Sequence, residues 1–358
     1  MTIQVTKPSV NLREKLNELE TNKGLKGNEI LQAETAQEVR NLIGAGRKNL
    51  IINGDMKMAQ RGTNFTNVQG YKLDRWQVNR YASSTFTTTR PNADLEGFER
   101  CIRIQRTSGN ASGGAIAINQ PLEQRDCFAL KGKAVTASFW IRVGADYAGA
   151  TDTLQAYISG CTDGTERSMN YNQFSNGSVI IDSIVVAPSN TWVKYTMTGV
   201  VPSNCNQVGF AVRCNSYLGT ASTNDYFDVV GVQLELGSVA TDFEHRSYGE
   251  ELALCQRYYF QWSGSNISST VGTGQFNSTT SFLHAYKNPV AMRVVPTGSY
   301  TGSVNVYQGS TGKGGGTITF NTHIAGGRLL FNGLTTSTLG GGGHVDISTA
   351  VLKFDAEL

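Results

Sequence analysis

Close pairs of carboxylates are the first residues whose spacing could do chemistry, because glycan-cleaving enzymes place two carboxyl groups beside the scissile bond. After the N-terminal region the close pairs include Asp225 and Asp228, Asp242 and Glu244, and Glu250 and Glu251. Strand geometry points Asp225 and Asp228 to opposite faces, and adjacent helical residues such as Glu250 and Glu251 diverge. We find no hydrolase signature and expect no enzymatic activity, although carboxylates distant in sequence could still converge.

A calcium site is a second possible chemistry. Asn53, Asp55 and Asp228 could supply hard oxygen ligands where the first and last strands of a sandwich meet. Capping of turns and hydrogen bonding to the backbone are commoner roles for such residues. We therefore assign no metal and no cofactor, with calcium as the weaker alternative.

The remaining reactive residue types show no catalytic spacing. The segment 309–314 lacks the spacing of a phosphate loop, because Tyr307 and Gly314 stand where glycine and Ser or Thr are needed. The four histidines are scattered, and none of the six cysteines forms a Cys-x-x-Cys motif. We expect reduced, mostly buried thiols, with a disulfide between Cys205 and Cys214 as the lesser alternative.

Composition narrows the class of protein further. The chain has 358 residues, enough for two or three domains, with 16% charged residues, a net charge of +3 and 40 glycines. The sequence has no apolar run of about 18 residues, so we expect no membrane-spanning helix. We also see no secretory signal. The absence of a dense Lys/Arg block argues against duplex nucleic acid as the main partner.

Residues 1–48 predict two short helices. Capping boxes open at Asn11 and Thr35, each with Glu three residues later. The apolar seams that follow consist of Leu12, Leu16 and Leu19, and of Val39, Leu42 and Ile43. Helices of two or three turns are not stable alone in water. Their seams need the rest of the chain, sister copies in a coiled coil, or a larger assembly, and we favour the last two.

Period-two alternation dominates residues 49–247 and predicts an antiparallel β-sandwich. On one face of segment 135–143 lie Val135, Ala137, Phe139, Ile141 and Val143. Segments 193–198, 208–213 and 226–235 also predict strands. Residues 248–358 predict a short helix followed by a second β module. The fold class is therefore mainly β, with short N-terminal helices, a sandwich and a C-terminal β module.

Aromatic residues on polar strand faces are our candidates for glycan binding. Trp140 shares its face with Thr136 and Arg142, Trp192 lies beside Lys194, and Tyr157 opposes the apolar residues of its own strand. A flat ring can cover the apolar face of a pyranose while polar neighbours bond its hydroxyls. Packing beneath loops or against a neighbouring subunit is the commoner role of such rings.

The sequence contains a set of short strings that are informative together. They are Asn49-Leu-Ile-Ile-Asn-Gly-Asp-Met56, Gln60-Arg-Gly62, Asp74-Arg-Trp76, Ser138-Phe-Trp140, Gln233-Leu-Glu-Leu-Gly237, Phe243-Glu-His-Arg-Ser-Tyr248, Cys255-Gln-Arg-Tyr-Tyr259, Pro289, Met292-Arg293 and Pro296. Together these strings resemble tail-fibre and receptor-binding proteins of tailed bacteriophages, particularly those with a jelly roll like a carbohydrate-binding module. The resemblance implies a homotrimer whose N-terminus attaches to other tail proteins and whose distal β modules face the host. It implies no shared sugar-binding residues.

The leading functional hypothesis is a non-enzymatic tail fibre that binds a host surface glycan, located in the virion and made in the host cytoplasm. Three copies per fibre would convert weak sugar binding into strong attachment. Trp140→Ala and Trp192→Ala should then fold normally and lose cell adsorption. The alternatives are a purely structural tail adaptor and, third, a depolymerase.

Overall fold

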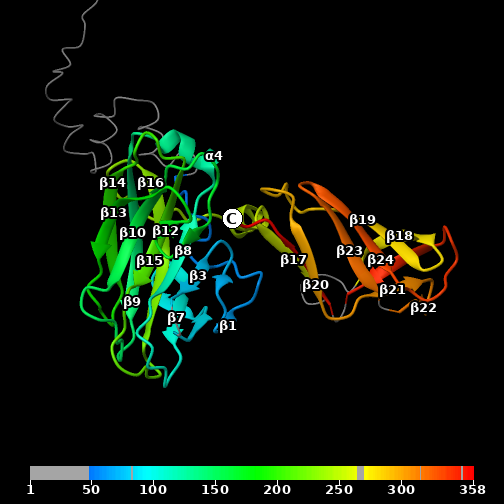
Figure 1. The fold of residues 1–358 in the computed structure, drawn as a ribbon, viewed down its shortest axis with the longest axis horizontal. Coiled ribbons are helices and arrows are strands. Elements are labelled where there is room, and N and C mark those ends of the chain that lie inside the picture. The colour runs from blue at the N-terminus through cyan, green and yellow to red at the C-terminus, as the bar shows by residue number, and fades with distance from the viewer. Residues whose placement is uncertain (1–47, 82–83, 264–269, 315, 348–349) are drawn as a thin grey trace, which may run out of the picture. The chain divides into compact units, whose positions relative to one another are not determined.

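The computed structural model describes residues 48–358 except 82–83, 264–269, 315 and 348–349 (Figure 1). Residues 51–358 form one compact unit, which we call the second unit. Both predicted seams in the N-terminal region lie outside the described residues. Among the helices that are described, none is long and apolar enough to span a membrane.

Two six-stranded antiparallel sheets form the β-sandwich (Figure 1). The first sheet has the strand order β1 (Asn64–Thr66), β4 (Phe86–Thr89), β7 (Ile102–Arg106), β16 (Tyr226–Leu236), β9 (Ala134–Val143) and β14 (Val193–Val200). The second has the order β13 (Ser178–Val185), β10 (Leu154–Cys161), β15 (Gln207–Cys214), β8 (Ile116–Pro121), β3 (Gln77–Arg80) and β2 (Gly70–Tyr71).

The core of the sandwich lies between these sheets. On β9 the side chains of Val135, Ala137 and Phe139 are fully buried, as their alternation predicts. The ring of Phe139 in the first sheet lies 5.2 Å from that of Phe210 in the second. Burial of such rings from both inner faces stabilises the sandwich.

Short elements cover parts of the sandwich. They are the hairpins β5 (Asn92–Leu95) with β6 (Phe98–Arg100) and β11 (Met169–Asn170) with β12 (Gln173–Phe174), and the helical turns α4 (Gln124–Cys127) and η1 (Phe128–Leu130). Alternation cannot predict these additions, because strands of two to four residues are too short to show a periodic pattern.

Helix α5 (Tyr248–Gln256) leads to two further antiparallel sheets, which we call the C-terminal sheets. One has the order β17 (Tyr259–Ser263), β26 (Val351–Asp355) and β20 (Thr297–Thr301). The other has the order β22 (Thr311–Gly312), β21 (Asn305–Gln308), β25 (Gly342–Asp346), β18 (Thr270–Ser278), β19 (Ser281–Lys287), β24 (Gly326–Asn332) and β23 (Thr317–His323).

The C-terminal sheets have an aromatic core. Phe260 of β17 stacks on Phe354 of β26 with centroids 4.4 Å apart, and Phe276, Phe282 and Phe331 of the seven-stranded sheet are buried in the same cluster. The predicted mainly β fold with an antiparallel sandwich is confirmed. The predicted domain boundary at residues 247 and 248 stays a prediction.

Candidate functional site

A turn at Asn53 organises the start of the second unit. Its backbone has φ +57°, a conformation that asparagine tolerates better than most residues. The side-chain amide donates to the carbonyls of Met58 (2.9 Å) and Asp74 (3.0 Å), and its oxygen accepts from the Met58 amide (2.8 Å). The Asn53 carbonyl accepts from the Trp76 indole at 2.8 Å. All these groups are satisfied within the fold, so Asn53 is a structural residue.

The same turn anchors helix α5. Ser247 caps the helix by accepting from the Glu250 amide at 3.3 Å. The carboxylate of Glu251, which is buried, accepts from the backbone amide of Asn53 and from Arg246 Nη1 at 3.2 and 3.3 Å. The helix start is therefore tied to the sandwich through a buried charge with several donors.

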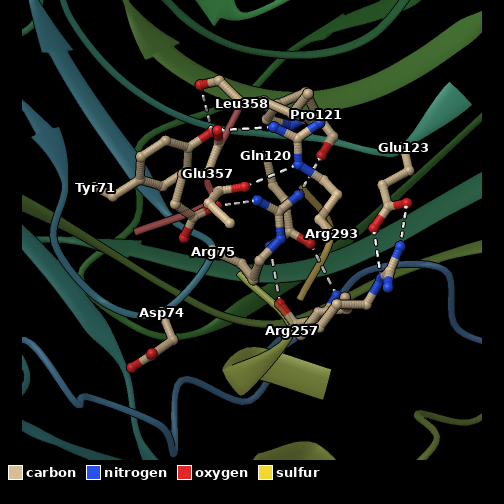
Figure 2. Close-up of polar contacts among 12 residues, drawn as sticks. Tyr71, Asp74, Arg75, Gln120, Pro121, Glu123, Arg257, Arg293, Glu357 and Leu358 are labelled. Carbon is tan, nitrogen blue, oxygen red and sulfur yellow. Dashed lines mark hydrogen bonds and ion pairs between the residues drawn. The ribbon is translucent and has the colours of Figure 1, made fainter. Parts of the chain in front are cut away.

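Figure 2 shows how the C-terminal residues are held. The guanidinium of Arg75, which is 1% exposed, donates to the Glu357 carboxylate and, at 2.6 Å, to the Pro121 carbonyl. Arg293 donates to the carbonyls of Ala356 (2.8 Å) and Glu357 (2.9 Å). Charged hydrogen bonds of this kind are the stronger ones, so they connect the last residues of the chain firmly to the sandwich.

A second ion pair in the same region joins Arg257, just after α5, to Glu123 beside α4. The pair is bidentate, with N–O distances of 2.8 and 2.9 Å (Figure 2). Burial acts to raise the pKa of Glu123, but hydrogen bonds from Arg257 and Tyr258 prevail and lower it. The Arg75 guanidinium lies 3.6 Å over the ring of Tyr258. These contacts fix the position of helix α5 and strand β17.

A cleft with a volume of about 510 Å³ opens beside α5 and β17. This volume suits a small ligand such as a short saccharide. Its lining residues come from several separate segments and are Lys57, Met58, Ala59, Gln60, Arg90, Tyr248, Leu252, Gln256, Phe260, Gln261, Trp262 and Pro289.

Two aromatic side chains of the cleft differ in packing and exposure. Trp262 is half-buried, and its ring packs against the rings of Phe260, Tyr286 and Phe354 at centroid distances of 5.8, 5.3 and 5.2 Å. Tyr248, the first residue of α5, is 63% exposed. One ring is therefore held in place while the other faces solvent, and flat rings of both kinds can cover the apolar face of a sugar.

Three glutamines supply amide groups to the cleft. The amide of Gln60 donates to Asp74 Oδ1 (2.6 Å) and the Tyr259 carbonyl (2.8 Å), which fixes its orientation. The oxygen of Gln261 accepts from the Tyr259 hydroxyl at 2.7 Å, leaving the NH₂ group of Gln261 for a ligand. The side chain of Gln256 makes no hydrogen bond to the part of the chain that is described. Amides can both donate to and accept from sugar hydroxyls.

Trp140 and Trp192 lie together on the outer face of the first sheet. Trp140 on β9 pairs with Lys194 on β14, and Trp192 directly precedes β14. Both side chains are half-buried. The Trp192 indole donates to the Ala93 carbonyl of β5 at 2.7 Å, and Arg142 lies 4.6 Å over its ring. Their role in glycan binding stays a prediction.

The charged groups of this face pair with one another. Asp228 is fully buried and accepts from Arg103 at 2.8 and 2.9 Å and from Arg142 at 2.9 Å. The Arg103 guanidinium in turn lies 3.6 Å over the ring of Tyr226. Much of the hydrogen-bonding capacity of this face is therefore used inside the protein.

Tyr157 lies on the other sheet, and its ring is buried. The side chain is 8% exposed and clusters with Met169 and Phe174 of the β11–β12 hairpin. Its hydroxyl donates to the side chain of Gln155. The alternation predicts an open ring here, and the structure differs because the hairpin folds over it. Its role as a glycan ligand stays a prediction.

The proposed calcium ligands do not assemble. Asn53 bonds to the backbone as described above, Asp55 lies 3.0 Å from Lys57, and Asp228 bonds to two arginines. In residues 48–358 apart from the gaps, no group of three or more His, Cys, Asp or Glu residues could hold a metal ion. The calcium alternative therefore has no ligand set in the described part of the chain.

The cysteines are packing residues. All six are buried and unpaired, so the alternative of a disulfide between Cys205 and Cys214 is wrong. Burial raises the pKa of the Cys127 thiol to about 12, which leaves it protonated and unreactive at neutral pH.

No family model matches this chain, and no curated protein matches it. Among solved structures it is similar to the enzymatically active domain of tailspike protein 4 of bacteriophage CBA120, with 15% identity and a TM-score of 0.34 over 53% of this chain and 21% of that one. It is also similar to TmCBM61 in complex with β-1,4-galactotriose, with 11% identity and a TM-score of 0.32 over 53% of this chain and all of that one. A family 22 carbohydrate-binding module of Clostridium thermocellum Xyn10B gives 11% identity and a TM-score of 0.29 over 50% and 98% of the two chains.

At these low TM-scores and identities the similarities carry no conclusion about function. The sandwich is defined by its own strand order and core.

The sequence pattern missed the cleft residues Tyr248, Trp262 and Gln60. They come from segments almost two hundred positions apart, so neither alternation nor spacing brings them together. A signal was nevertheless present, because Gln60 and Tyr248 belong to the strings that carry the phage resemblance. Three of those strings, which contain Gln60, Arg75 and Arg257, lie at the cleft or at the ion pairs beside it.

Proposed function

We propose that this chain is a carbohydrate-binding protein without catalytic activity and that the cleft beside α5 is its sugar site. The observation that carries the proposal is the combination of Trp262 and Tyr248 with the amides of Gln60, Gln256 and Gln261 around a cavity of about 510 Å³. Rings for the apolar face of a pyranose and amides for its hydroxyls are what sugar recognition needs.

The lining of the cleft supports a binding role over hydrolysis. Among the described residues it contains no Asp or Glu, whereas glycoside hydrolysis uses two carboxyl groups flanking the bond. The carboxylates of the close pair Asp225 and Asp228 also form separate ion pairs. Asp225 pairs with Arg106, and Asp228 pairs with Arg103 and Arg142. We therefore favour a glycan-binding protein over a depolymerase.

We further infer that the chain is a phage tail fibre that attaches the virion to a host surface glycan. The resemblance of its motif strings supports this role. In this proposal the N-terminal segment with Leu12, Leu16 and Leu19 joins a homotrimer to other tail proteins, and the β modules face the host. Three cleft copies per fibre multiply a weak single-site affinity.

A purely structural adaptor is the second candidate, and exposed apolar residues favour it. Ile180 and Val185 on edge strand β13 are 46% and 47% exposed, and Val200 at the end of edge strand β14 is 63% exposed. The two edge strands contact each other. Apolar groups gathered on a sheet edge suit a protein partner, including a sister subunit.

The test compares two exposed tyrosines. Tyr248→Ala removes a ring from the cleft, and Tyr81→Ala removes an equally exposed ring, 66% against 63%, from a position outside the cleft lining. We expect the full chain to bind members of an array of bacterial surface polysaccharides. Loss of the stacking ring should weaken that binding about three- to tenfold, whereas Tyr81→Ala should bind as wild type.

Two results would contradict the proposal. One is an array on which the wild-type chain binds no polysaccharide. The other is equal affinity of Tyr248→Ala and wild type for a glycan that the chain does bind.

A further inference from the structure

The charged residues that line the cleft are all cationic. They are Lys57 and Arg90. Lys57 already has a counter-ion, because its ammonium lies 3.0 Å from Asp55 Oδ2, and it also donates to the Arg246 carbonyl at 2.6 Å. Arg90 is therefore the cation whose environment decides what charge a ligand should carry.

Arg90 is half-buried and lacks a counter-ion within the described residues. Its Nη1 donates to the carbonyls of Lys57 (2.5 Å) and Met56 (3.4 Å), which are neutral acceptors. Its Nε is buried and has no hydrogen-bond partner there. Burial and the nearby cation of Arg100 lower the pKa of Arg90 more than the negative charges of Glu99 and Asp74 raise it, so its charged form is disfavoured where it stands.

A buried or half-buried guanidinium is costly unless an anion or a full set of acceptors compensates it. A carboxylate is the best match, because the planar guanidinium binds it through charge-assisted hydrogen bonds. The neighbouring Trp262 and Tyr248 rings suit a sugar that carries this group.

We propose that the cleft selects an acidic saccharide, with its anionic group at Arg90 and a sugar ring against Trp262. This inference rests on the proposed function and names the class of glycan. The anion can be the carboxylate of a uronic acid or of a sialic acid, or a sulfate ester. All three share the negative charge, and the experiment separates them.

The experiment titrates the full chain with oligogalacturonate, oligosialic acid, a sulfated galactan oligomer and the corresponding neutral galactan oligomer. We expect at least one acidic probe to bind at least tenfold more tightly than the neutral one. That preference should shrink as NaCl rises, because salt weakens the attraction between the anionic probe and the partly exposed Arg90, although less than it weakens that of a fully exposed pair. The acid with the highest affinity identifies the anionic group.

Variants at Arg90 test whether this residue causes the preference for acidic saccharides. Arg90→Gln should lose about tenfold in affinity for the acidic probe and little for the neutral one, and Arg90→Lys should retain part of the preference because it keeps the charge. Arg125→Gln is the matched control, since Arg125 is 69% exposed and lies outside the cleft lining. It should bind as wild type.

The outcomes distinguish this inference from the proposed function. Equal binding of neutral and acidic probes, weakened by Tyr248→Ala and unchanged in Arg90→Gln, overturns the charge preference and leaves the sugar site intact. Binding of none of the four saccharides overturns both. If the variant at Arg90 unfolds, the salt dependence and probe ranking of the wild-type chain still decide the question.

Discussion

Two aromatic surfaces of this protein, the outer face of the first sheet and the cleft beside α5, have similar composition and different chemistry. On the sheet face Arg103 and Arg142 share Asp228, and the Trp192 indole bonds to a backbone carbonyl. In the cleft the Tyr248 ring is 63% exposed and Arg90 has an Nε without a partner in the described chain. Unused hydrogen-bonding capacity in a concave site, rather than the mere presence of rings and polar residues, distinguishes a binding site from a packed surface.

The largest expected effect concerns stability, on the sheet face. Asp228→Asn leaves two partly buried arginines without their carboxylate, which should lower the free energy of unfolding by about 2–4 kcal/mol. Urea unfolding followed by circular dichroism measures this. Asp94→Asn is the control, because Asp94 is 74% exposed and lies 3.9 Å from Arg142; it should change stability little.

The Asp228→Asn variant also tests whether the sheet face takes part in glycan binding. At a temperature where Asp228→Asn is still folded, its affinity for glycan should equal that of wild type. A loss of glycan binding by the folded variant would show that the sheet face, and not the cleft alone, contributes to recognition.

A smaller effect is expected at Trp192. Trp192→Phe removes the hydrogen bond to Ala93 and keeps an aromatic ring, so the free energy of unfolding should fall by about 1 kcal/mol with glycan affinity unchanged. The same denaturant titration and a binding titration check both parts.

Alanine variants at Trp140 and Trp192 test whether the outer face of the first sheet, rather than the cleft, binds glycan. If both fold normally and both abolish binding to cells or glycan, the binding site lies on the outer sheet face, as the sequence alone predicts. Retained binding by both variants removes that site.

Four long strands of the sandwich were predicted from the sequence. The alternation at 135–143, 193–198, 208–213 and 226–235 coincides with β9, β14, β15 and β16. The covered ring of Tyr157 was not predictable, because a pattern within one strand contains no information about a hairpin that folds over it.

The cleft was beyond prediction for a related reason. Its walls depend on long-range contacts such as the bond from the Asn53 amide to Glu251, 198 positions away. The motif strings marked these positions without revealing their role. Asn53, Arg75 and Arg293 hold elements together around the site rather than facing a ligand.

The most direct test of the sugar site is a crystal structure of the full chain soaked with the saccharide that binds best in the titrations. We predict electron density for a sugar ring against Trp262 and within reach of Tyr248, with its anionic group at Arg90. Density confined to the outer sheet face around Trp140 and Trp192, with an empty cleft, would contradict this account.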